Sequence, residues 1–332
     1  MAKSDELPLY SDAKSPGYAG VKTFFGADQA EPDDLSEDVD VAGFGVPFDG
    51  GVSNKPGTRY GPEALRDATD RHSRTFQSED ERFTIGTERT ACYDSVTFRD
   101  CGDAPVVPND ITRTFDLVRA YTEVISRKTM PVLLGGDHYI TYPAFVGYAD
   151  SVGEDVGLLH LDAHTDTWGE NDLYGEHYHG SPMARIAESE YGSYANHAMV
   201  GIRGHADMEF LDILEEDGLY VDYGHEVQDK GIEESIRGAI DHVTEDVDHV
   251  YLTIDIDVTD PSYAPGTGTP SPGGLTSHQL LTAADLLGEC DAIGAMDLME
   301  VAPNLDPTDT TSMLGANTLA RFLESYFYDD VA

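Results

Sequence analysis

The chain has 332 residues, and its 63 acidic and 20 basic residues give a formal net charge of −43 at pH 7. Such a surface repels nucleic acid and anionic membranes, and no apolar run forms a signal-peptide core or reaches the roughly 20 residues of a membrane span. The acidic residues are spread along the whole chain and indicate adaptation to molar salt, where the Debye length falls to about 3 Å, so we expect a cytoplasmic protein of a salt-accumulating halophile.

Strands and helices are expected to alternate along the chain after a polar N-terminal arm at residues 1–38. Short apolar runs predict strands at 39–47, 95–100, 131–134, 156–161, 198–202, 250–256 and 292–299. Helical spacing predicts helices from 63 onward and at 110–128, 181–190, 206–216, 232–243, 276–288 and 311–327, with Asp110 as an N-cap. Strands that are apolar on both faces favour an α/β fold in which helices cover both sides of a parallel sheet. Because there is no linker or repeat, we expect one domain over residues 39–332.

The loop after the first strand, residues 48–62, is rich in glycine and proline. It lacks the G-x-x-x-x-G-K-[ST] pattern of a phosphate-binding loop. We interpret it as the rim of a binding site, with Asp49, Asn54 and Arg59 as candidate site residues.

A cluster of metal-binding side chains is expected where the strand at 156–161 ends. Asp162, His164 and Asp166 follow it at i, i+2 and i+4, and in extended chain side chains two apart point to the same side. Buried carboxylates without a compensating charge are costly, so three such groups at one point require a cation. Carboxylate oxygens combined with imidazole favour a hard or borderline divalent ion such as Mn²⁺ over a thiolate-type zinc site.

Two more strand ends carry residues of the same kind. His138 follows the strand at 131–134, while Asp255 and Asp257 stand at the end of the strand at 250–256. In parallel α/β sheets, ligand sites form outside the carboxyl ends of the strands. The sequence thus offers six candidate ligands: His138, Asp162, His164, Asp166, Asp255 and Asp257. Six are more than one ion usually takes, so we predict a two-metal site, in which the pKa of a shared water falls towards neutrality.

The motifs Gly-Gly-Asp-His (135–138), Asp-Ala-His-Thr-Asp (162–166) and Thr-Ile-Asp-Ile-Asp (253–257) resemble three signatures of the ureohydrolase family, which includes arginase and agmatinase. The resemblance extends from about Gly45 to the C-terminus. It implies an arginase-like three-layer α/β/α sandwich around a parallel sheet of about eight strands. It also implies two Mn²⁺ ions per subunit and a homotrimer or homohexamer.

The resemblance also assigns roles to individual positions. The six candidate ligands match the family's metal ligands, with Asp162 and Asp255 at the positions that bridge the two ions. Glu300 matches the carboxylate that binds the guanidinium group, whose planar donors a carboxylate can engage in charge-assisted pairs. His179 matches the histidine that gives a proton to the departing amine. The histidines without such a match, which we interpret as structural or surface residues, are His160, His177, His205 and His225.

These roles imply hydrolysis of a guanidino group, in which a metal-bridging hydroxide attacks the guanidinium carbon and His179 protonates the amine that leaves. The substrate we favour is the small cationic guanidine agmatine, cleaved to putrescine and urea. The reason is the loop at 168–178, which holds Glu170, Asp172 and Glu176 and no basic residue. Within it, Asp172 and Asn171 are the candidates for contacting the substrate tail.

Three alternatives stay open at this point. A guanidino acid such as 4-guanidinobutanoate or 3-guanidinopropanoate would favour a basic or donor-rich end of the cleft. A metal-dependent deacetylase would need an acyl channel in place of the role of Glu300. A non-catalytic paralogue would fail to bind metal, although no ligand position is lost in this chain.

Overall fold

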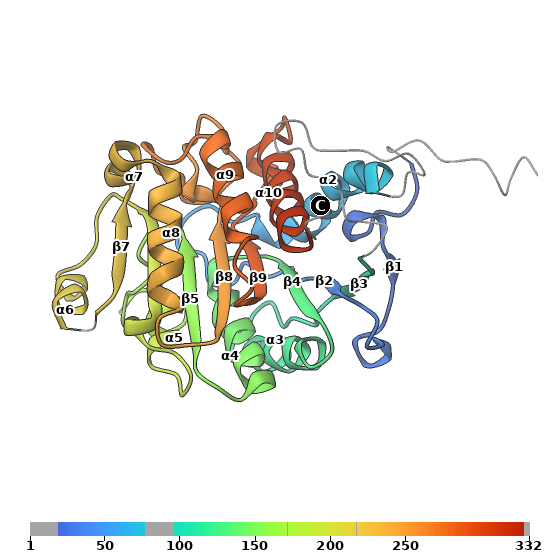
Figure 1. Cartoon of the computed structure of the whole chain (residues 1–332), viewed down its shortest axis with the longest axis horizontal. Helices are drawn as coiled ribbons and strands as arrows, with labels where there is room; N and C mark the ends of the chain where they lie inside the picture. Colours follow the sequence, from blue (N-terminus) through green and yellow to red (C-terminus); the bar gives the residue numbers. More distant parts are fainter. Residues whose placement is uncertain (1–18, 77–95, 171, 217, 329–332) are drawn as a thin grey trace, which may run out of the picture.

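The computed structural model describes residues 19–76, 96–170, 172–216 and 218–328. Within them, nine strands form one sheet in which every pairing is parallel, in the order β1-β3-β2-β4-β9-β8-β5-β6-β7 (Figure 1). The strands are β1 (Asp28–Gln29), β2 (Val41–Gly45), β3 (Phe98–Asp103), β4 (Met130–Leu134), β5 (Val156–Leu161), β6 (His197–Ile202), β7 (Tyr220–Tyr223), β8 (His249–Asp255) and β9 (Ile293–Met299). The predicted α/β fold with a parallel sheet is therefore confirmed, and the described sheet has nine strands where about eight were expected.

Helices cover both faces of the sheet (Figure 1). The α-helices are α2 (Gly61–Phe76), α3 (Ile111–Ser126), α4 (Thr141–Val152), α5 (Pro182–Ala187), α6 (Glu209–Glu216), α7 (Gly224–Lys230), α8 (Ile232–Val243), α9 (Ser277–Leu287) and α10 (Thr310–Tyr326). The short 3-10 helices are η1 (Phe24–Gly26), η2 (Pro32–Asp34), η3 (Thr58–Tyr60), η5 (His138–Ile140), η6 (Tyr194–Asn196), η7 (Ile256–Val258) and η8 (Pro303–Leu305). One apolar core lies under α2, α8, α9 and α10, and a second lies under α3, α4 and α5.

The central strands have no polar face because both of their faces are covered. Every residue of β4 and of β5 is buried, as expected for a parallel sheet between two helix layers. At the start of α3, the Asp110 side chain accepts a hydrogen bond from the backbone N–H of Arg113, which confirms the predicted N-cap.

The sequence analysis missed two helices, α4 and α7, and two strands at the edges of the sheet, β1 and β7. Helix α4 buries eight of its 12 residues, all between Thr141 and Ala149, so its sequence shows no polar stripe at helical spacing. The edge strands are short, with two residues in β1 and four in β7. Short elements without periodicity cannot be recognised from their own residues.

The described part of the expected N-terminal arm packs as part of the domain. The rings of Phe24 and Phe25 are buried in the core, and Leu35 is buried against the other face of the sheet. The backbone N–H of Phe24 donates to Asp100 Oδ2 at 2.7 Å, and β1 pairs with β3. Residues 1–18 of the arm lie outside the described residues.

A buried ion-pair network joins α2 to β3, and its loss should be costly. Arg66 donates to both carboxylate oxygens of Asp100, at 2.9 and 3.1 Å, and to Asp103 at 2.6 Å. We expect Arg66→Met to lower the free energy of unfolding by about 3–5 kcal/mol, because Asp100 would stay buried without its cation. Urea denaturation in molar KCl measures this change.

The control is Arg127→Met, which removes an exposed ion pair with Glu123 and should cost less than about 1 kcal/mol. Equal losses in the two variants would contradict the assignment of Arg66 as a buried anchor.

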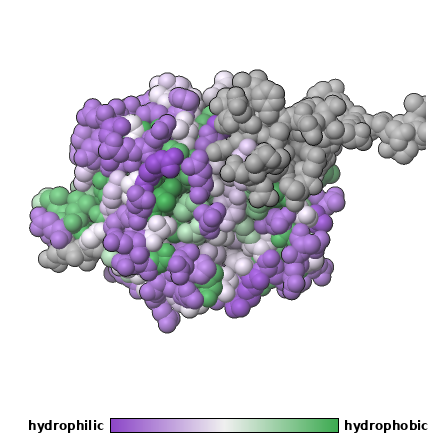
Figure 2. All heavy atoms as spheres, in the orientation of Figure 1, coloured by the Kyte–Doolittle hydropathy of each residue, from purple (hydrophilic) through white to green (hydrophobic). Residues whose placement is uncertain are grey.

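The surface agrees with the acidic composition. Hydrophilic residues cover most of the face in Figure 2, with smaller hydrophobic patches between them. No helix in the described part of the chain has both the length and the apolar character of a bilayer span.

Candidate active site

The sheet order brings the candidate ligands to one edge. Strands β4, β9, β8 and β5 are neighbours, and all of them run in the same direction. His138 opens η5 after β4, Asp162 follows β5, and Asp255 and Asp257 lie at the end of β8 and in η7. Between them, β9 ends one residue before Glu300. Residues far apart in the chain therefore meet at the carboxyl ends of four adjacent strands.

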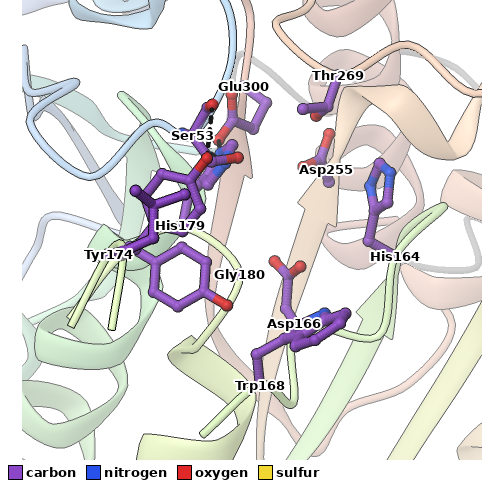
Figure 3. A pocket seen from close by; sticks show the side chains of 12 residues that line it. Ser53, His164, Asp166, Trp168, Tyr174, His179, Gly180, Asp255, Thr269 and Glu300 are labelled. Carbon is purple, nitrogen blue, oxygen red and sulfur yellow. Dashed lines mark hydrogen bonds and ion pairs between the residues drawn. The ribbon is translucent and has the colours of Figure 1, made fainter. Parts of the chain in front are cut away.

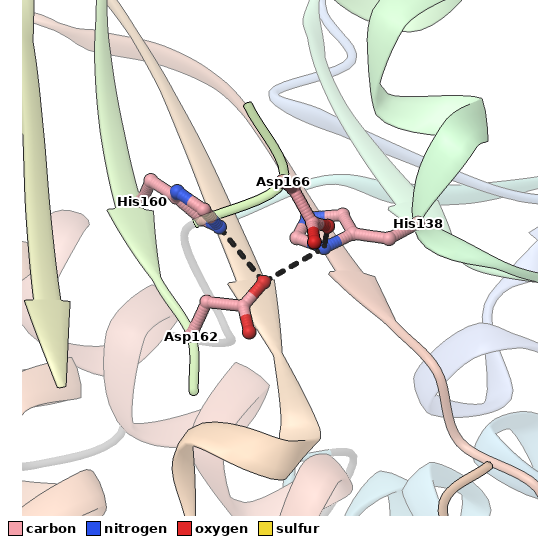
Figure 4. Close-up of side chains that lie close together, drawn as sticks. All are labelled: His138, His160, Asp162 and Asp166. Atoms are coloured by element: carbon pink, nitrogen blue, oxygen red, sulfur yellow. Dashed lines mark hydrogen bonds and ion pairs between the residues drawn. The ribbon is translucent and has the colours of Figure 1, made fainter. Parts of the chain in front are cut away.

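One group of potential ligands surrounds His138 (Figure 4). Its Nδ1 atom lies 3.0 Å from Asp162 Oδ2, 3.0 Å from Asp166 Oδ2 and 3.4 Å from Asp255 Oδ2. This nitrogen makes no hydrogen bond of regular geometry in the described structure, whereas Nε2 lies 2.9 Å from the Thr253 hydroxyl. Burial opposes the charged imidazole, but the three carboxylates outweigh it and raise the pKa of His138.

A second group consists of Asp162, His164 and Asp257. His164 Nδ1 lies 3.1 Å from Asp257 Oδ2 and 3.5 Å from Asp162 Oδ1, so Asp162 belongs to both groups. Within each group, one ligand atom from each residue lies within 4.8 Å of the others. The structure thus brings all six candidate ligands together, with Asp255 beside the first group.

The charges of this cluster fit a divalent cation. Burial, together with the negative charges of Asp257 and Asp162, raises the pKa of Asp255 well above its usual value. Burial and Asp162 also raise the pKa of Asp257. A bound cation would relieve both effects, because it neutralises carboxylates that are buried together. The oxygen-rich donor set with imidazole suits Mn²⁺-type ions, and it includes the unpartnered His138 Nδ1.

His160, which we interpreted as a structural or surface residue, is fully buried in β5. Its Nε2 atom lies 2.8 Å from Asp162 Oδ2, within the first group (Figure 4). Its place two residues before Asp162 puts both side chains on the same side of the strand. His177 bonds the Tyr139 hydroxyl at 3.2 Å, and His205 and His225 are exposed.

Two site residues have a strained backbone. Asp166 has φ +49° and Glu300 has φ +62°, in the left-handed region that side chains with a Cβ rarely adopt. Such conformations cost roughly 1–3 kcal/mol and concentrate at functional sites. Both residues line the same cavity.

Glu300, His179 and Ser53 form a chain of hydrogen bonds on one side of the cavity (Figure 3). Glu300 Oε1 lies 2.9 Å from His179 Nδ1 and also accepts the backbone N–H of His138 at 2.9 Å. His179 Nε2 lies 2.9 Å from the backbone nitrogen of Ser53 and 2.6 Å from its hydroxyl. Burial opposes the charge of His179, but Glu300 outweighs it and raises the pKa of His179 to about 9.

Asp137 holds the backbone around His179. It is fully buried and accepts the backbone N–H of Gly51 at 2.7 Å, and Gly51 in turn accepts the backbone N–H of His179 at 3.0 Å. Burial and the negative charge of Glu300 raise the pKa of Asp137 to about 7. The rim loop is thereby fixed against the segment that carries His179.

A cavity of about 390 Å³ opens over this constellation. It is lined by Ser53, His164, Asp166, Trp168, Leu173, Tyr174, Tyr178, His179, Gly180, Asp255, Thr269 and Glu300. No lysine or arginine is among these lining residues. Part of the wall is aromatic, and the rings of Tyr174 and Tyr178 are stacked with their centroids 5.2 Å apart. Figure 3 shows Tyr174 across the pocket from Asp255 and His164.

The acidic end expected for the cleft is not found among the lining residues. Asp172 and Glu170 are exposed and do not line the cavity, and Glu176 pairs with Arg185 at 3.0 Å. These carboxylates were expected to face the substrate because they follow the central strand, but the loop directs them elsewhere. Asn171 lies outside the described residues.

The rim loop contributes through a residue that the sequence analysis did not select. Ser53 lines the cavity, whereas Asp49, Asn54 and Arg59 do not. Asp49 is buried, accepts the backbone N–H of Gly57 and pairs with Arg59. Asn54 Nδ2 donates to the carbonyl of Gly268 at 3.1 Å. No sequence signal distinguished Ser53 from its neighbours, because its contact is with a residue 126 positions away.

Comparison with known proteins identifies the family of this chain. The model of the Arginase family matches residues 39–324. An agmatinase of Chromobacterium violaceum is 34% identical, with 95% of this chain and 91% of the relative covered. A guanidinopropionase of Pseudomonas aeruginosa is 33% identical, with 97% of this chain and 96% of the relative covered. The solved structure of proclavaminate amidino hydrolase from Streptomyces clavuligerus matches with a TM-score of 0.82 at 30% identity, covering 94% of this chain and 99% of that chain. The chain therefore belongs to the Arginase family and is an amidinohydrolase of that family.

Proposed function

We propose that the chain hydrolyses agmatine to putrescine and urea at a centre that holds two Mn²⁺ ions per subunit. The ligands would be His138, Asp162, His164, Asp166, Asp255 and Asp257. When bound, two divalent cations at such a site supply a water-derived nucleophile at neutral pH and stabilise developing negative charge. We also propose a homotrimer or homohexamer in the cytoplasm of a salt-accumulating halophile, which the family resemblance and the acidic composition support.

The observation that carries this proposal is the free oxygen of Glu300. Oε1 already accepts N–H groups of His138 and His179, whereas the buried Oε2 has no partner in the described structure. A buried carboxylate oxygen without a donor is costly, and a guanidinium N–H is a donor of matching charge. Glu300 lines the cavity beside Asp255, so a guanidinium bound there would present its carbon to the metal-ligand cluster.

The cavity supports a cationic tail on the substrate. Trp168, Tyr174 and Tyr178 line its wall, and aromatic faces attract ammonium groups. Agmatine carries an ammonium group at the end far from its guanidinium. The aromatic wall would bind this ammonium, which is the role first expected of the acidic loop at 168–178.

One observation favours the second candidate, a guanidino acid. Lys55 is exposed in the rim loop and forms no ion pair or hydrogen bond within the described residues. A Cβ added at Gly268 would lie 2.7 Å from the carbonyl oxygen of Lys55 and 3.8 Å from Glu300 Oε2, so the Lys55 backbone runs close to the site. The relative named guanidinopropionase is 33% identical.

The test compares substrates directly. Urea release is measured in molar KCl with Mn²⁺ from agmatine, arginine, 4-guanidinobutanoate and 3-guanidinopropanoate. Urea released mainly from agmatine supports the proposal. Urea released mainly from a guanidino acid overturns only the assignment of agmatine as the substrate. A folded, metal-loaded sample that releases no urea from any of them overturns the proposed reaction.

Lys55→Glu should separate the two candidates further. If Lys55 binds a substrate carboxylate, the substitution lowers kcat/KM for guanidino acids by about tenfold, since it replaces attraction by repulsion. If agmatine is the substrate, we expect KM for agmatine to stay equal or fall. Arg237→Glu changes the net charge equally at an exposed ion pair on α8 and should affect neither substrate. A guanidino-acid activity unchanged by Lys55→Glu would exclude Lys55 from substrate binding.

A further inference from the structure

We propose that Ser53 is a further catalytic residue, which passes the proton of His179 to the departing amine. This inference rests on the proposed hydrolysis of a guanidine. It assigns to the rim loop a chemical role in addition to that of enclosing the site.

Both ring nitrogens of His179 are engaged in the structure. Nδ1 lies 2.9 Å from Glu300 Oε1, while Nε2 lies 2.6 Å from Ser53 Oγ and 2.9 Å from the Ser53 backbone nitrogen. Neither nitrogen is left to face a substrate. Ser53 lines the cavity, and Figure 3 shows it beside His179 and Glu300 at one end of the pocket.

The ring is also held in place by its backbone and its burial. The backbone N–H of His179 donates to the Gly51 carbonyl, and the Gly51 N–H donates to the buried Asp137 carboxylate. The side chain of His179 is 9% exposed. Rotating the imidazole towards the cavity would break its bonds to Glu300 and Ser53 together, and each is a bond in a buried setting. The serine hydroxyl is already in position.

The proton transfer balances without any further reactant. Because the pKa of His179 is raised to about 9, the neutral ring is the minority form at neutral pH. In the neutral ring, Nδ1–H donates to Glu300, and Nε2 accepts the hydroxyl and the backbone N–H of Ser53. The attacking water gives a proton to Ser53 Oγ while the Oγ–H proton passes to Nε2, so that Nε2–H then donates to Oγ and the hydroxyl hydrogen is free for the cavity. As the C–N bond breaks, its electron pair stays on the amine nitrogen, which takes the Ser53 Oγ–H proton while Oγ takes the Nε2–H proton. Ser53 and neutral His179 are both regenerated.

The test uses Ser53→Ala and the conservative variant Ser53→Thr in the full chain with Mn²⁺. General acid catalysis contributes roughly 10²–10⁴-fold, and in Ser53→Ala the freed Nε2–H of His179 can protonate the amine directly but from a poorer position, so we expect the substitution to lower kcat by about 10–100-fold. KM should change less than about twofold. Ser53→Thr keeps a hydroxyl and should restore most of kcat. Ser189→Ala removes a half-buried hydroxyl outside the cavity lining and should leave kcat unchanged.

A solvent-isotope experiment separates a relay from a structural role. With mixtures of H₂O and D₂O, two protons moving in one step give a curved dependence of kcat on deuterium content in the wild type. Ser53→Ala should give a straight line at equal Mn²⁺ content and thermal stability.

The relay is overturned if Ser53→Ala keeps the wild-type kcat, or if its loss lies wholly in KM or in Mn²⁺ content. A wild-type chain that releases urea separates this failure from that of the proposed function, because a chain inactive on every guanidine would overturn both.

Discussion

Glu300→Gln is expected to lower kcat/KM for guanidine hydrolysis by about 10³-fold, which corresponds to about 4 kcal/mol of transition-state stabilisation. The substitution removes the negative charge that faces the guanidinium at Oε2. It also weakens the hydrogen bond from His179 Nδ1–H to Glu300 Oε1. That bond stabilises the imidazole tautomer with its hydrogen on Nδ1, in which Nε2 can accept a proton. Two contacts of the reaction are lost in one change, so the effect should exceed that of a single hydrogen bond.

The measurement is urea release with kcat and KM determined separately, together with Mn²⁺ content and thermal stability. Glu324→Gln is the matched control, because Glu324 is a buried glutamate of α10 that does not line the cavity. Its activity should stay within about threefold of the wild type. An active Glu300→Gln variant would remove the reason for a guanidine substrate and favour the deacetylase alternative, since an acyl substrate needs no carboxylate at this position.

The convergence of the metal-binding residues could be predicted because it depends on topology alone. Parallel strands share one carboxyl edge, so His138 after β4, Asp162 after β5 and Asp255 on β8 could be expected at the same edge of the sheet. The strand order β4-β9-β8-β5, which the sequence analysis did not predict, then brings them together.

The other features of the site and of the fold depend on contacts between residues far apart in the chain, which no local sequence pattern predicts. Ser53 joins the site only because the rim loop folds onto His179, and Asp172 leaves it because its own loop turns outward. Helix α4 has almost no exposed face, and without a polar stripe a buried helix has no period to detect.

Asp255→Asn is expected to abolish guanidine hydrolysis, with kcat at least about 10³-fold lower, while leaving the metal-free fold intact. Asp255 Oδ2 lies 3.4 Å from His138 Nδ1, and Oδ1 accepts the backbone N–H of Asp257 at 2.7 Å. Asparagine can keep the backbone bond but cannot supply the charge that a divalent cation needs. We expect fewer than two Mn²⁺ per chain, and the rise in melting temperature that Mn²⁺ gives to the wild type should shrink accordingly.

In the metal-free protein, we expect Asp255→Asn to leave the melting temperature unchanged or to raise it. Burial and the charges of Asp257 and Asp162 raise the pKa of Asp255, so its ionisation opposes folding. That penalty is absent below the carboxylate's unfolded pKa near 4 and grows as the pH rises towards the folded pKa. In EDTA at pH 7, Asp255→Asn should therefore melt at a temperature at least as high as the wild type, and any gain should disappear near pH 4.

A control at another buried aspartate should show the reverse pattern. Asp222 in β7 bonds Lys230 and the Tyr220 hydroxyl, so Asp222→Asn should lower the melting temperature and leave Mn²⁺ content and kcat unchanged. If Asp255→Asn instead unfolds the metal-free protein while Asp222→Asn does not, the cluster stabilises the fold by itself. If Asp255→Asn keeps both Mn²⁺ and activity, Asp255 is not a metal ligand. A buried carboxylate that destabilises the metal-free fold but is required for metal binding and activity indicates a cation-binding site.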